Sequence, residues 1–306
     1  MKLLDRSFLQ DLKRDGTFNE ASFAREYESK WSGTVADAFF NGDVFDRNRQ
    51  LQKPEYEHSG RSSAASYYVI AVDVGRKGCD SVVCVFKVTP QSMGSAIKSL
   101  VNIYTLSDEH FEDQAIKLKE LFYKFKARRL VIDANGLGIG LVDYMIKPQI
   151  DATGASYPDF GVYNDDEGYY KKYRTNSTEQ DALYLIKANA PINTEAHANA
   201  QTQLQSGKVK LLVEERLAKN KLLGTKMGQA MTPEQRADYI KPFKLTSILK
   251  EEMMNLREEN EGVNIILKQA NKNIRKDKFS AFEYGLYYIK TVEEQRKKKK
   301  RFNAKE

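Results

Sequence analysis

The stretch from Tyr67 to Gly75 constrains the fold more than any other part of the sequence. It reads Tyr-Tyr-Val-Ile-Ala-Val-Asp-Val-Gly, a run of aromatic and β-branched residues that is typical of a strand. Because both faces of the run are apolar, we expect a central strand that helices cover on each side. Asp73, near its end, is costly to bury unless a metal ion or a hydrogen-bonded turn compensates its charge.

The composition is typical of a globular protein. Of the 306 residues, 41% are hydrophobic and 30% are charged, so a folded core is expected. No apolar run approaches the ~20 residues that a membrane span needs, and the N-terminus lacks the apolar segment of a signal peptide. Cys79 and Cys84 form no metal-ligand pattern, so we expect a reducing, intracellular compartment.

The net charge of +7 comes mostly from one segment. Arg296–Arg301 holds six basic residues, and the rest of the chain has 43 basic against 42 acidic residues. Such a run predicts either a solvated tail or a phosphate-binding tail.

The order of predicted elements indicates an α/β domain. Strands at 67–75, 81–89 and 100–106 come first, followed by a helix at 109–126, a strand at 129–133 and a helix at 141–146. A short glycine-containing turn makes the first two strands antiparallel neighbours. A hairpin followed by helix, strand and helix implies a mixed central sheet flanked by helices.

The remaining segments extend this domain at both ends. Further strands are predicted at 160–163, 207–213 and 262–267, and further helices at 178–188, 195–205, 245–259 and 277–292. Residues 1–60, with a helix at 18–40, form an N-terminal arm. We therefore divide the chain into an arm (1–60), a domain (61–292) and a basic C-terminal tail (293–306).

Three acids follow the predicted order of elements. Asp73 and Asp133 each end an apolar strand, and Asp277 opens the last amphipathic helix. If both strands are central, their carboxylates project from one sheet edge and repel each other unless a cation lies between them. Oxygen ligands suit Mg²⁺ or Mn²⁺. Asp80 is a fourth candidate ligand. A single acid at the end of a strand is more often a turn or cap residue, and Asp277 alone could be a favourable charge at a helix N-terminus, so the prediction depends on the order of the acids.

This pattern permits phosphodiester hydrolysis with two metal ions, about 3.5–4 Å apart. Asp73 would bridge the ions, with Asp133 and Asp277 on either side, and metal-bound water would be the nucleophile. The three histidines, His58, His110 and His197, have no Ser or Cys partner in the pattern. We interpret them as structural or exposed.

Basic residues supply candidate DNA contacts. One cluster surrounds Asp277, and another pair lies on a predicted strand. The candidates are Lys77, Lys208, Lys210, Lys272, Arg275, Lys276, Lys278, Lys297, Lys298, Lys299, Lys300 and Arg301.

The glycines Gly136, Gly138 and Gly140 have two interpretations. They follow a strand and precede a helix, where glycines can approach a pyrophosphate. Their spacing departs from the dinucleotide fingerprint, and the strand is not the first of the domain. The alternative, which we favour, is a turn that lets the helix start close to the strand.

At these residues the chain resembles the nuclease domain of the large terminase subunit of tailed bacteriophages, which has a ribonuclease H-like fold. The matching segments are 72–75 with 78–82, 131–143, and 276–285; segments 23–27, 31–33 and 37–40 resemble the chain that leaves the terminase ATPase domain. The resemblance covers roughly residues 18–292, and its middle motif and order of acids are its most specific parts.

The resemblance implies an endonuclease that cuts concatemeric double-stranded DNA during genome packaging in the host cytoplasm, with Mg²⁺ or Mn²⁺. It implies that Asp73, Asp133 and Asp277 are metal ligands. The implied partners are double-stranded DNA, the small terminase subunit, the portal protein and the ATPase part of the large subunit. The phosphate-loop motif of that ATPase does not occur in this sequence. We therefore expect a C-terminal half, either a fragment or a split-gene product, that cuts DNA without translocating it.

Two alternatives remain. A Holliday-junction resolvase or a transposase shares the order of acids. A non-catalytic packaging or docking module would keep the fold and the basic tail while the acids had structural roles.

Overall fold

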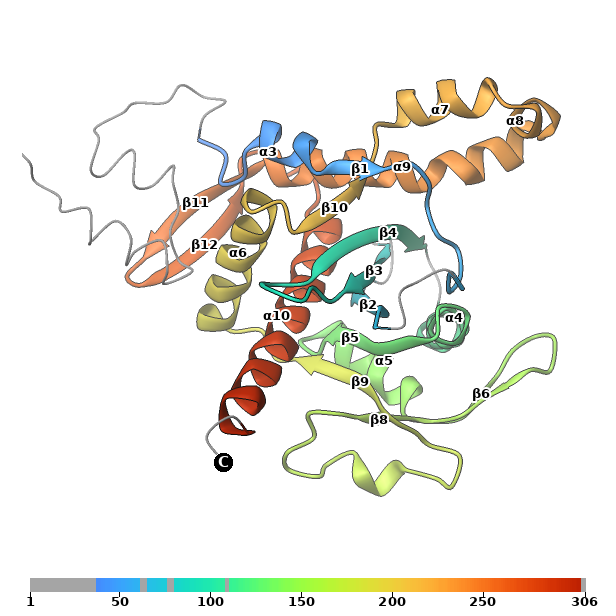
Figure 1. The fold of residues 1–306 in the computed structure, drawn as a ribbon. Helices are drawn as coiled ribbons and strands as arrows, with labels where there is room; N and C mark the ends of the chain where they lie inside the picture. Colours follow the sequence, from blue (N-terminus) through green and yellow to red (C-terminus); the bar gives the residue numbers. More distant parts are fainter. Residues whose placement is uncertain (1–36, 61–64, 76–79, 108–109, 304–306) are drawn as a thin grey trace, which may run out of the picture.

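The computed structural model describes residues 37–60, 65–75, 80–107 and 110–303 (Figure 1). Most of the helix predicted at 18–40 lies outside these ranges; within its last residues, Ala38 forms an isolated bridge with Arg257. None of the helices in the described ranges combines the length and the apolar character that crossing a membrane requires.

An eight-stranded sheet organises the described residues, with the strand order β1-β10-β4-β3-β2-β5-β9-β8. Its strands are β1 (Arg49–Leu51), β2 (Tyr67–Asp73), β3 (Ser81–Thr89), β4 (Ile97–Leu106), β5 (Ala127–Asp133), β8 (Phe160–Val162), β9 (Glu179–Ile186) and β10 (Val209–Leu212). The strands β2, β3 and β4 form an antiparallel meander, and β5, β9 and β8 continue in parallel on the other side of β2. This is the ribonuclease H-like mixed sheet that the sequence predicted.

The central position of β2 follows from its two apolar faces. Val69 and Ala71 belong to the core on one side of the sheet, and Tyr68, Ile70 and Val72 belong to the core on the other. All five side chains are fully buried. The prediction of a central strand covered on both faces is confirmed.

Helices cover both faces of the sheet (Figure 1). On one face lie α4 (Phe111–Lys124) and α5 (Leu137–Met145); on the other lie α6 (Ala190–Gln205), α9 (Pro233–Met254) and α10 (Asp277–Asn303). The smaller elements are α3 (Gly42–Arg47), α7 (Glu215–Leu223), α8 (Lys226–Ala230), the 3-10 helix η1 (Lys171–Tyr173), and the strand pairs β6 (Gln149–Ile150) with β7 (Ser156–Tyr157) and β11 (Leu256–Glu261) with β12 (Asn264–Gln269).

Helix α10 packs closely against β2 and β3 because Gly285 has no side chain. A Cβ atom at Gly285 would lie 2.4 Å from Cε2 of Phe86 and 3.1 Å from Cβ of Ala71. The ring of Phe86 also contacts that of Phe282, with 5.8 Å between centroids. This contact fixes the helix against the strand that ends in Asp73.

The helix predicted at 178–188 is wrong, because this segment is strand β9. Its apolar core, Ala182–Ile186, is short, and in a short apolar run the periodicity does not separate a buried strand from a buried helix. The tertiary pairing decides: β9 pairs in parallel with both β5 and β8.

The helix predicted at 245–259 is shifted. Helix α9 begins earlier, at Pro233, where Thr232 and Gln235 form a capping box, and it continues through Pro242. It ends at Met254, and the residues after it pair with β12 as strand β11. Proline near the middle suggested a break, but the packing of Phe243, Leu245 and Leu249 holds the helix together.

The last helix is longer than predicted. The sequence placed its end at residue 292, whereas α10 continues to Asn303 and includes the whole basic run. The division of the chain into arm, domain and tail remains a prediction.

We predict that Gly285→Ala destabilises the protein. Alanine is about 1 kcal/mol better than glycine inside a helix, but forcing a methyl group against Phe86 and Ala71 costs about 1–3 kcal/mol. Because the contact with Phe86 at 2.4 Å is far inside van der Waals distance, we expect the upper part of this cost and a net loss of about 1–2 kcal/mol in the free energy of unfolding, measured by urea denaturation. Gly60→Ala, whose Cβ would meet no atom within 4 Å, is the matched control. Equal stability of the two variants would contradict the close packing of α10.

Candidate active site

Asp73 and Asp133 lie at the same edge of the sheet. They are the last residues of β2 and β5, which pair in parallel with Val72 opposite Ile132. Asp277 is the first residue of α10, which packs on β2. Three segments that are far apart in the sequence therefore converge at one end of the central strand.

The electrostatics of Asp73 show that the charges of the other two acids act on it. The pKa of Asp73 is raised from 3.8 to about 7. Burial is the largest cause of this rise, and the negative charges of Asp277 and Asp133 also contribute to it. Lys276 opposes this effect with its positive charge. A carboxyl group that is expensive to ionise in this position would be stabilised as a carboxylate by a bound cation.

Asp133 is held by the turn that follows β5. Its Oδ1 accepts a hydrogen bond from the backbone N–H of Asn135 at 3.1 Å. Burial raises the pKa of Asp133, and this hydrogen bond opposes the shift. A Cβ at Gly138 would lie only 1.6 Å from the carbonyl oxygen of Asp133, and a Cβ at Gly140 would lie 2.6 Å from the Phe111 ring. These two glycines thus let α5 start close to the strand, in agreement with the turn interpretation.

Asp277 is positioned by a buried glutamate that the sequence did not reveal. Glu252 of α9 accepts a hydrogen bond from the backbone N–H of Phe279 at 3.0 Å and pairs with Lys278 at 3.1 Å. Its side chain is 1% exposed, and its negative charge also contributes to the raised pKa of Asp73. Nothing in the sequence separates Glu252 from the solvent-facing acids of an amphipathic helix, such as Glu251.

The turn after β2 is fixed by Ser81 and by Gln114 of α4. The Ser81 Oγ accepts a hydrogen bond from Gly75 N–H at 2.8 Å and lies 2.7 Å from Oε1 of Gln114. Asp80, immediately before Ser81, is partly exposed, and the described residues show no hydrogen bond between it and Asp73. Lys77 lies outside the described residues.

The donor chemistry of these acids fits a divalent metal. No group of three or more His, Cys, Asp or Glu side chains in the described ranges is arranged to hold a metal ion as it stands. Asp133 and Asp277 nevertheless lie close enough for their charges to act on Asp73. Strand and helix ends fix the three backbones, and carboxylates reorient by rotation about χ1 and χ2.

His197 has a structural role near this site. It lies 2.6 Å from Glu283 through Nδ1, both side chains are buried, and its ring faces that of Phe279 with 6.1 Å between centroids. Burial raises the pKa of Glu283, and the contact with His197 lowers it. The pair joins α6 to the start of α10, consistent with the structural interpretation from sequence.

The predicted basic residues divide between two ends of the sheet. Lys276 and Lys278 lie beside the acids, as the pKa effect and the ion pair above show, and Lys272 and Arg275 are exposed just before Asp277. Lys208 and Lys297 lie at the opposite end, where burial and then their positive charges lower the pKa of Lys98. Lys210 is opposite Ser99, near the start of β4. Lys298 is exposed, and the side chains of Lys299, Lys300 and Arg301 lie outside the described set.

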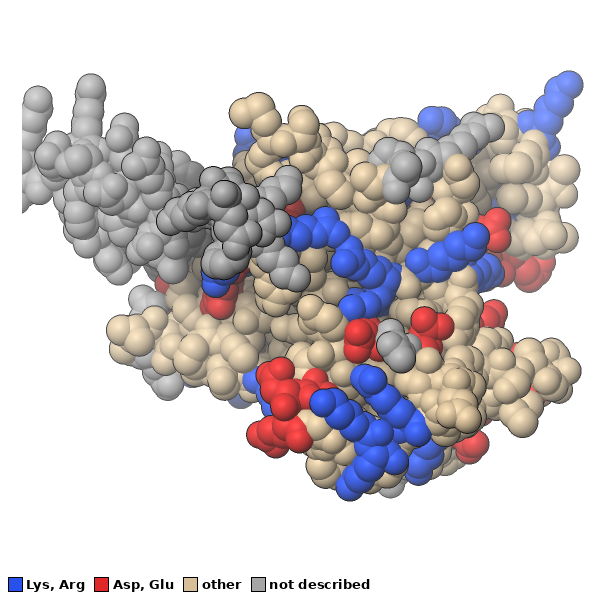
Figure 2. Space-filling view, turned by 60° about the horizontal axis from the view of Figure 1, so that its bottom comes forward, with Lys and Arg blue, Asp and Glu red and all other residues tan. Residues whose placement is uncertain are grey.

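Figure 2 shows Lys and Arg side chains gathered in patches on one face of the molecule, with Asp and Glu side chains between them. A surface that mixes basic and acidic side chains can contact phosphates and also hold a metal ion, whereas a uniformly basic surface cannot hold the metal ion.

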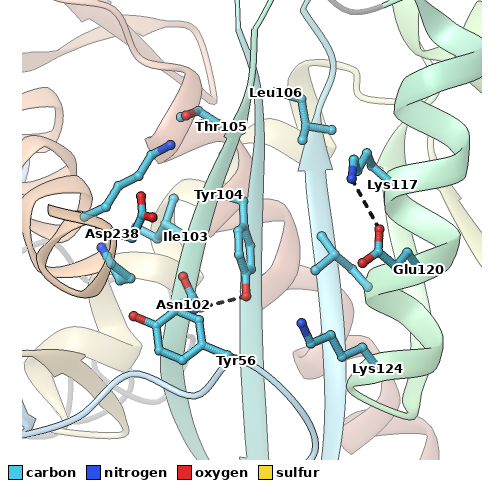
Figure 3. A pocket seen from close by; sticks show the side chains of 13 residues that line it. Tyr56, Asn102, Ile103, Tyr104, Thr105, Leu106, Lys117, Glu120, Lys124 and Asp238 are labelled. Atoms are coloured by element: carbon cyan, nitrogen blue, oxygen red, sulfur yellow. Dashed lines mark hydrogen bonds and ion pairs between the residues drawn. The ribbon is translucent and has the colours of Figure 1, made fainter. Parts of the chain in front are cut away.

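A cavity of about 340 Å³ lies away from the three acids, along the edge of β4 (Figure 3). Tyr104 and Asn102 form one wall, and Lys117 and Glu120 of α4 form another; Asn102 donates to the Tyr104 hydroxyl at 3.1 Å. None of Asp73, Asp133 and Asp277 lines it. The acids therefore face the edge of the sheet rather than this enclosed space.

The strand order and the convergence of three acids at one sheet edge define a ribonuclease H-like domain with a candidate metal centre. No protein-family model and no curated protein matches the sequence.

Several solved structures are similar to this chain. The large terminase nuclease of the thermophilic phage G20c with bound magnesium is 12% identical, with a TM-score of 0.47, covering 82% of this chain and 96% of that one. The terminase nuclease domain of the bacterial virus Sf6 is 11% identical, with a TM-score of 0.42, covering 82% and 97%. The large terminase of bacteriophage HK97 is 9% identical, with a TM-score of 0.43, and this chain spans half of its length.

We predict that Glu252→Gln destabilises the protein by about 3 kcal/mol, because it leaves Lys278 without its buried partner. Urea denaturation measures the change. Glu251→Gln, an exposed neighbour on the same helix, should change the free energy of unfolding by less than about 0.5 kcal/mol. Similar values for the two variants would show that the Glu252–Lys278 pair does not hold the start of α10.

We also predict that Asp73 makes the metal-free protein less stable as the pH rises. Its pKa of about 7 in the folded state exceeds the ordinary value of 3.8, so the folded protein binds this proton more tightly than the unfolded chain does. The resulting stabilisation is full below pH ~4 and is lost as the pH rises to ~7, with a maximum of about 4 kcal/mol. Urea denaturation in EDTA at pH 5 and pH 8 should show a smaller pH effect for Asp73→Asn than for wild type. An identical pH effect in both proteins would contradict the raised pKa.

Proposed function

We propose that this protein is a divalent-metal-dependent endonuclease that cuts double-stranded DNA during phage genome packaging. The observation that carries the proposal is the partly buried carboxyl group of Asp73 at the end of the central strand, with Asp133 and Asp277 acting on it. Like-charged groups in a partly buried position favour a cation between them, and a basic surface beside them favours a polyanion.

In this proposal Asp73, Asp133 and Asp277 hold two Mg²⁺ or Mn²⁺ ions, with Asp73 between them and Asp80 as a further ligand. The ions, when bound, supply an activated water and neutralise charge on the scissile phosphate. The chain supplies the rest: β2, β5 and α10 fix the positions of the carboxylates, and Glu252 fixes the start of α10. No protein nucleophile is needed, which fits the structural roles of the histidines.

The basic residues near Asp277 are proposed to position the DNA backbone. Lys272, Arg275 and Lys276 are exposed beside the acids and would contact phosphates next to the cut. We propose the same role, contact with DNA phosphates, for the remaining basic candidates: Lys77, Lys208, Lys210, Lys278, Lys297, Lys298, Lys299, Lys300 and Arg301.

The proposed partners follow from the terminase family. They are double-stranded DNA, the small terminase subunit, the portal protein and an ATPase part of the large subunit, and the proposed location is the host cytoplasm.

Plasmid cleavage tests the proposal. We expect the wild-type chain to nick and linearise plasmid DNA in Mn²⁺ or Mg²⁺ but not in EDTA. Asp73→Ala should lower the rate by at least about 100-fold, because the ligand between the two ions is lost. Glu251→Gln is the control for a lost acid that is not in the site.

Each outcome decides the proposal. Folded wild-type protein that binds DNA without cutting it in either metal would support the packaging or docking module instead. Cutting that survives Asp73→Ala would place the chemistry elsewhere. Selective cutting of four-way junctions over plain duplexes would favour a resolvase.

A further inference from the structure

A series of arginine and tyrosine side chains connects the acid edge of the sheet with the basic end of α10. We call it the arginine–tyrosine track and define it as Tyr67, Arg128, Arg129, Tyr163 and Arg296. The guanidinium of Arg129 lies over the Tyr163 ring at 4.5 Å from its centroid. Arg128 and Arg296 both lie over the Tyr67 ring, at 5.2 and 5.4 Å.

The track begins at the edge where the acids lie. Tyr163 directly follows β8 and donates its backbone N–H to Leu183 of β9 at 2.7 Å. Because β8, β9 and β5 are parallel, Tyr163 and Asp133 both lie at the carboxyl ends of their strands. Strand spacing places these two backbones about 10 Å apart.

The track ends at the opposite edge of the sheet. Tyr67 is the first residue of β2, and Arg128 is near the start of β5. Arg296 is 19 residues beyond Asp277 on α10, so it lies about 28 Å from the acids along the helix. That interval corresponds to about 8 nucleotides along one strand of DNA.

Tyr184 and Tyr288 join the two ends of the track. Tyr184 lies 6.3 Å from Tyr163 and 4.7 Å from Tyr288, measured between ring centroids. Burial raises the pKa of Tyr288 to about 12, and the positive charges of Arg129 and Arg128 oppose the shift, so both arginines lie near it. The contacts between these arginine and tyrosine side chains therefore run without a break beside α10. In Figure 1, β9 lies next to this helix and β8 lies on the far side of β9.

Arg128 and Arg296 are exposed and carry the donors that a ligand can reach, whereas Arg129 is partly buried. Among the described residues, no carboxylate forms an ion pair with Arg128, Arg129 or Arg296. The Nε of Arg129 is buried and has no hydrogen-bond partner in the described part of the chain, while its Nη1 donates to the Arg128 carbonyl at 2.7 Å. Stacking on a tyrosine ring fixes a guanidinium without using its N–H groups.

Three acidic side chains in this part of the molecule pair with other basic residues. Lys98 pairs with Glu293 at 3.2 Å, Lys290 pairs with Glu195 at 2.7 Å, and Arg174 pairs with Asp181 at 3.5 Å. The arginines of the track thus form no ion pair with these acids, and a bound anion would be stabilised by their charge.

We propose that the arginine–tyrosine track binds the sugar–phosphate backbone of double-stranded DNA on one side of the cut. This proposal rests on the proposed nuclease function and extends the contact with DNA to the far end of α10. The exposed guanidinium groups of Arg128 and Arg296 provide bidentate donors for phosphate oxygens, Arg129 adds positive charge beside them, and the exposed Tyr163 provides a further polar contact. Lys208 and Lys297, which lie near Lys98, extend the same basic surface.

The test is the salt dependence of DNA binding by the full chain, measured in EDTA by fluorescence anisotropy with a 24-base-pair duplex. Each lost phosphate contact lowers the slope of log affinity against log salt by about 0.9. We expect Arg128→Gln, Arg129→Gln and Arg296→Gln together to reduce the slope by about 2–3 and the affinity at 100 mM salt by about tenfold or more. In cleavage assays the same variant should raise KM with little change in kcat.

A matched control carries the same change in net charge elsewhere. Arg216→Gln, Lys219→Gln and Lys226→Gln alter exposed residues of α7 and α8, which project away from α10 in Figure 1. This control variant should keep the wild-type slope. If the triple variant of the track is not folded by circular dichroism, the double variant Arg128→Gln with Arg296→Gln changes only exposed residues and should lower the slope by about 2.

The outcomes separate this inference from the nuclease proposal, because binding in EDTA does not depend on cutting. A lower slope for the track variants alone supports the track. Equal slopes for the track and control variants, or no binding by wild type at 50 mM salt, would overturn it even where wild type cuts plasmid. A loss confined to single-stranded oligonucleotides would also overturn the assignment to duplex DNA.

Discussion

The packing of α10 against the central strand is the contact on which the rest of the structure depends. Gly285 allows the helix to approach Phe86 and Ala71 closely, and Glu252 binds the first turn of the helix through Phe279 N–H and Lys278. Together these contacts set Asp277 beside the end of β2. Without this packing, Asp73 would lose the neighbouring negative charge of Asp277, which contributes to its raised pKa.

The same helix also organises the charge of the molecule. Its first residue belongs to the acid site, and its basic end lies beside Tyr67 and Lys98 at the opposite edge of the sheet. One rigid element therefore connects the three acids with a basic cluster about 28 Å away.

The sequence predicted the central sheet well where the signal was local and failed where it was not. The strands β2 to β5 and the glycine turn after Asp133 were predicted because their residues repeat apolar patterns between clear turns. Strand β9 was predicted as a helix because a short apolar run carries no period of its own, and its pairing with β5 and β8 decided its form. Glu252 and the His197–Glu283 contact were not predicted, since each joins helices more than 25 residues apart in the sequence.

The sequence by itself determined the order of the acids and the buried strand that carries the first of them, because apolar runs and strand-end carboxylates are local properties of the chain. Only the tertiary structure decided which charges meet. It placed Lys276 and Glu252 within electrostatic range of Asp73, and it placed Lys208 and Lys297 at the other edge of the sheet. The physical reason is that electrostatic energy depends on distance in space and on burial, and neither quantity can be obtained from separation along the chain.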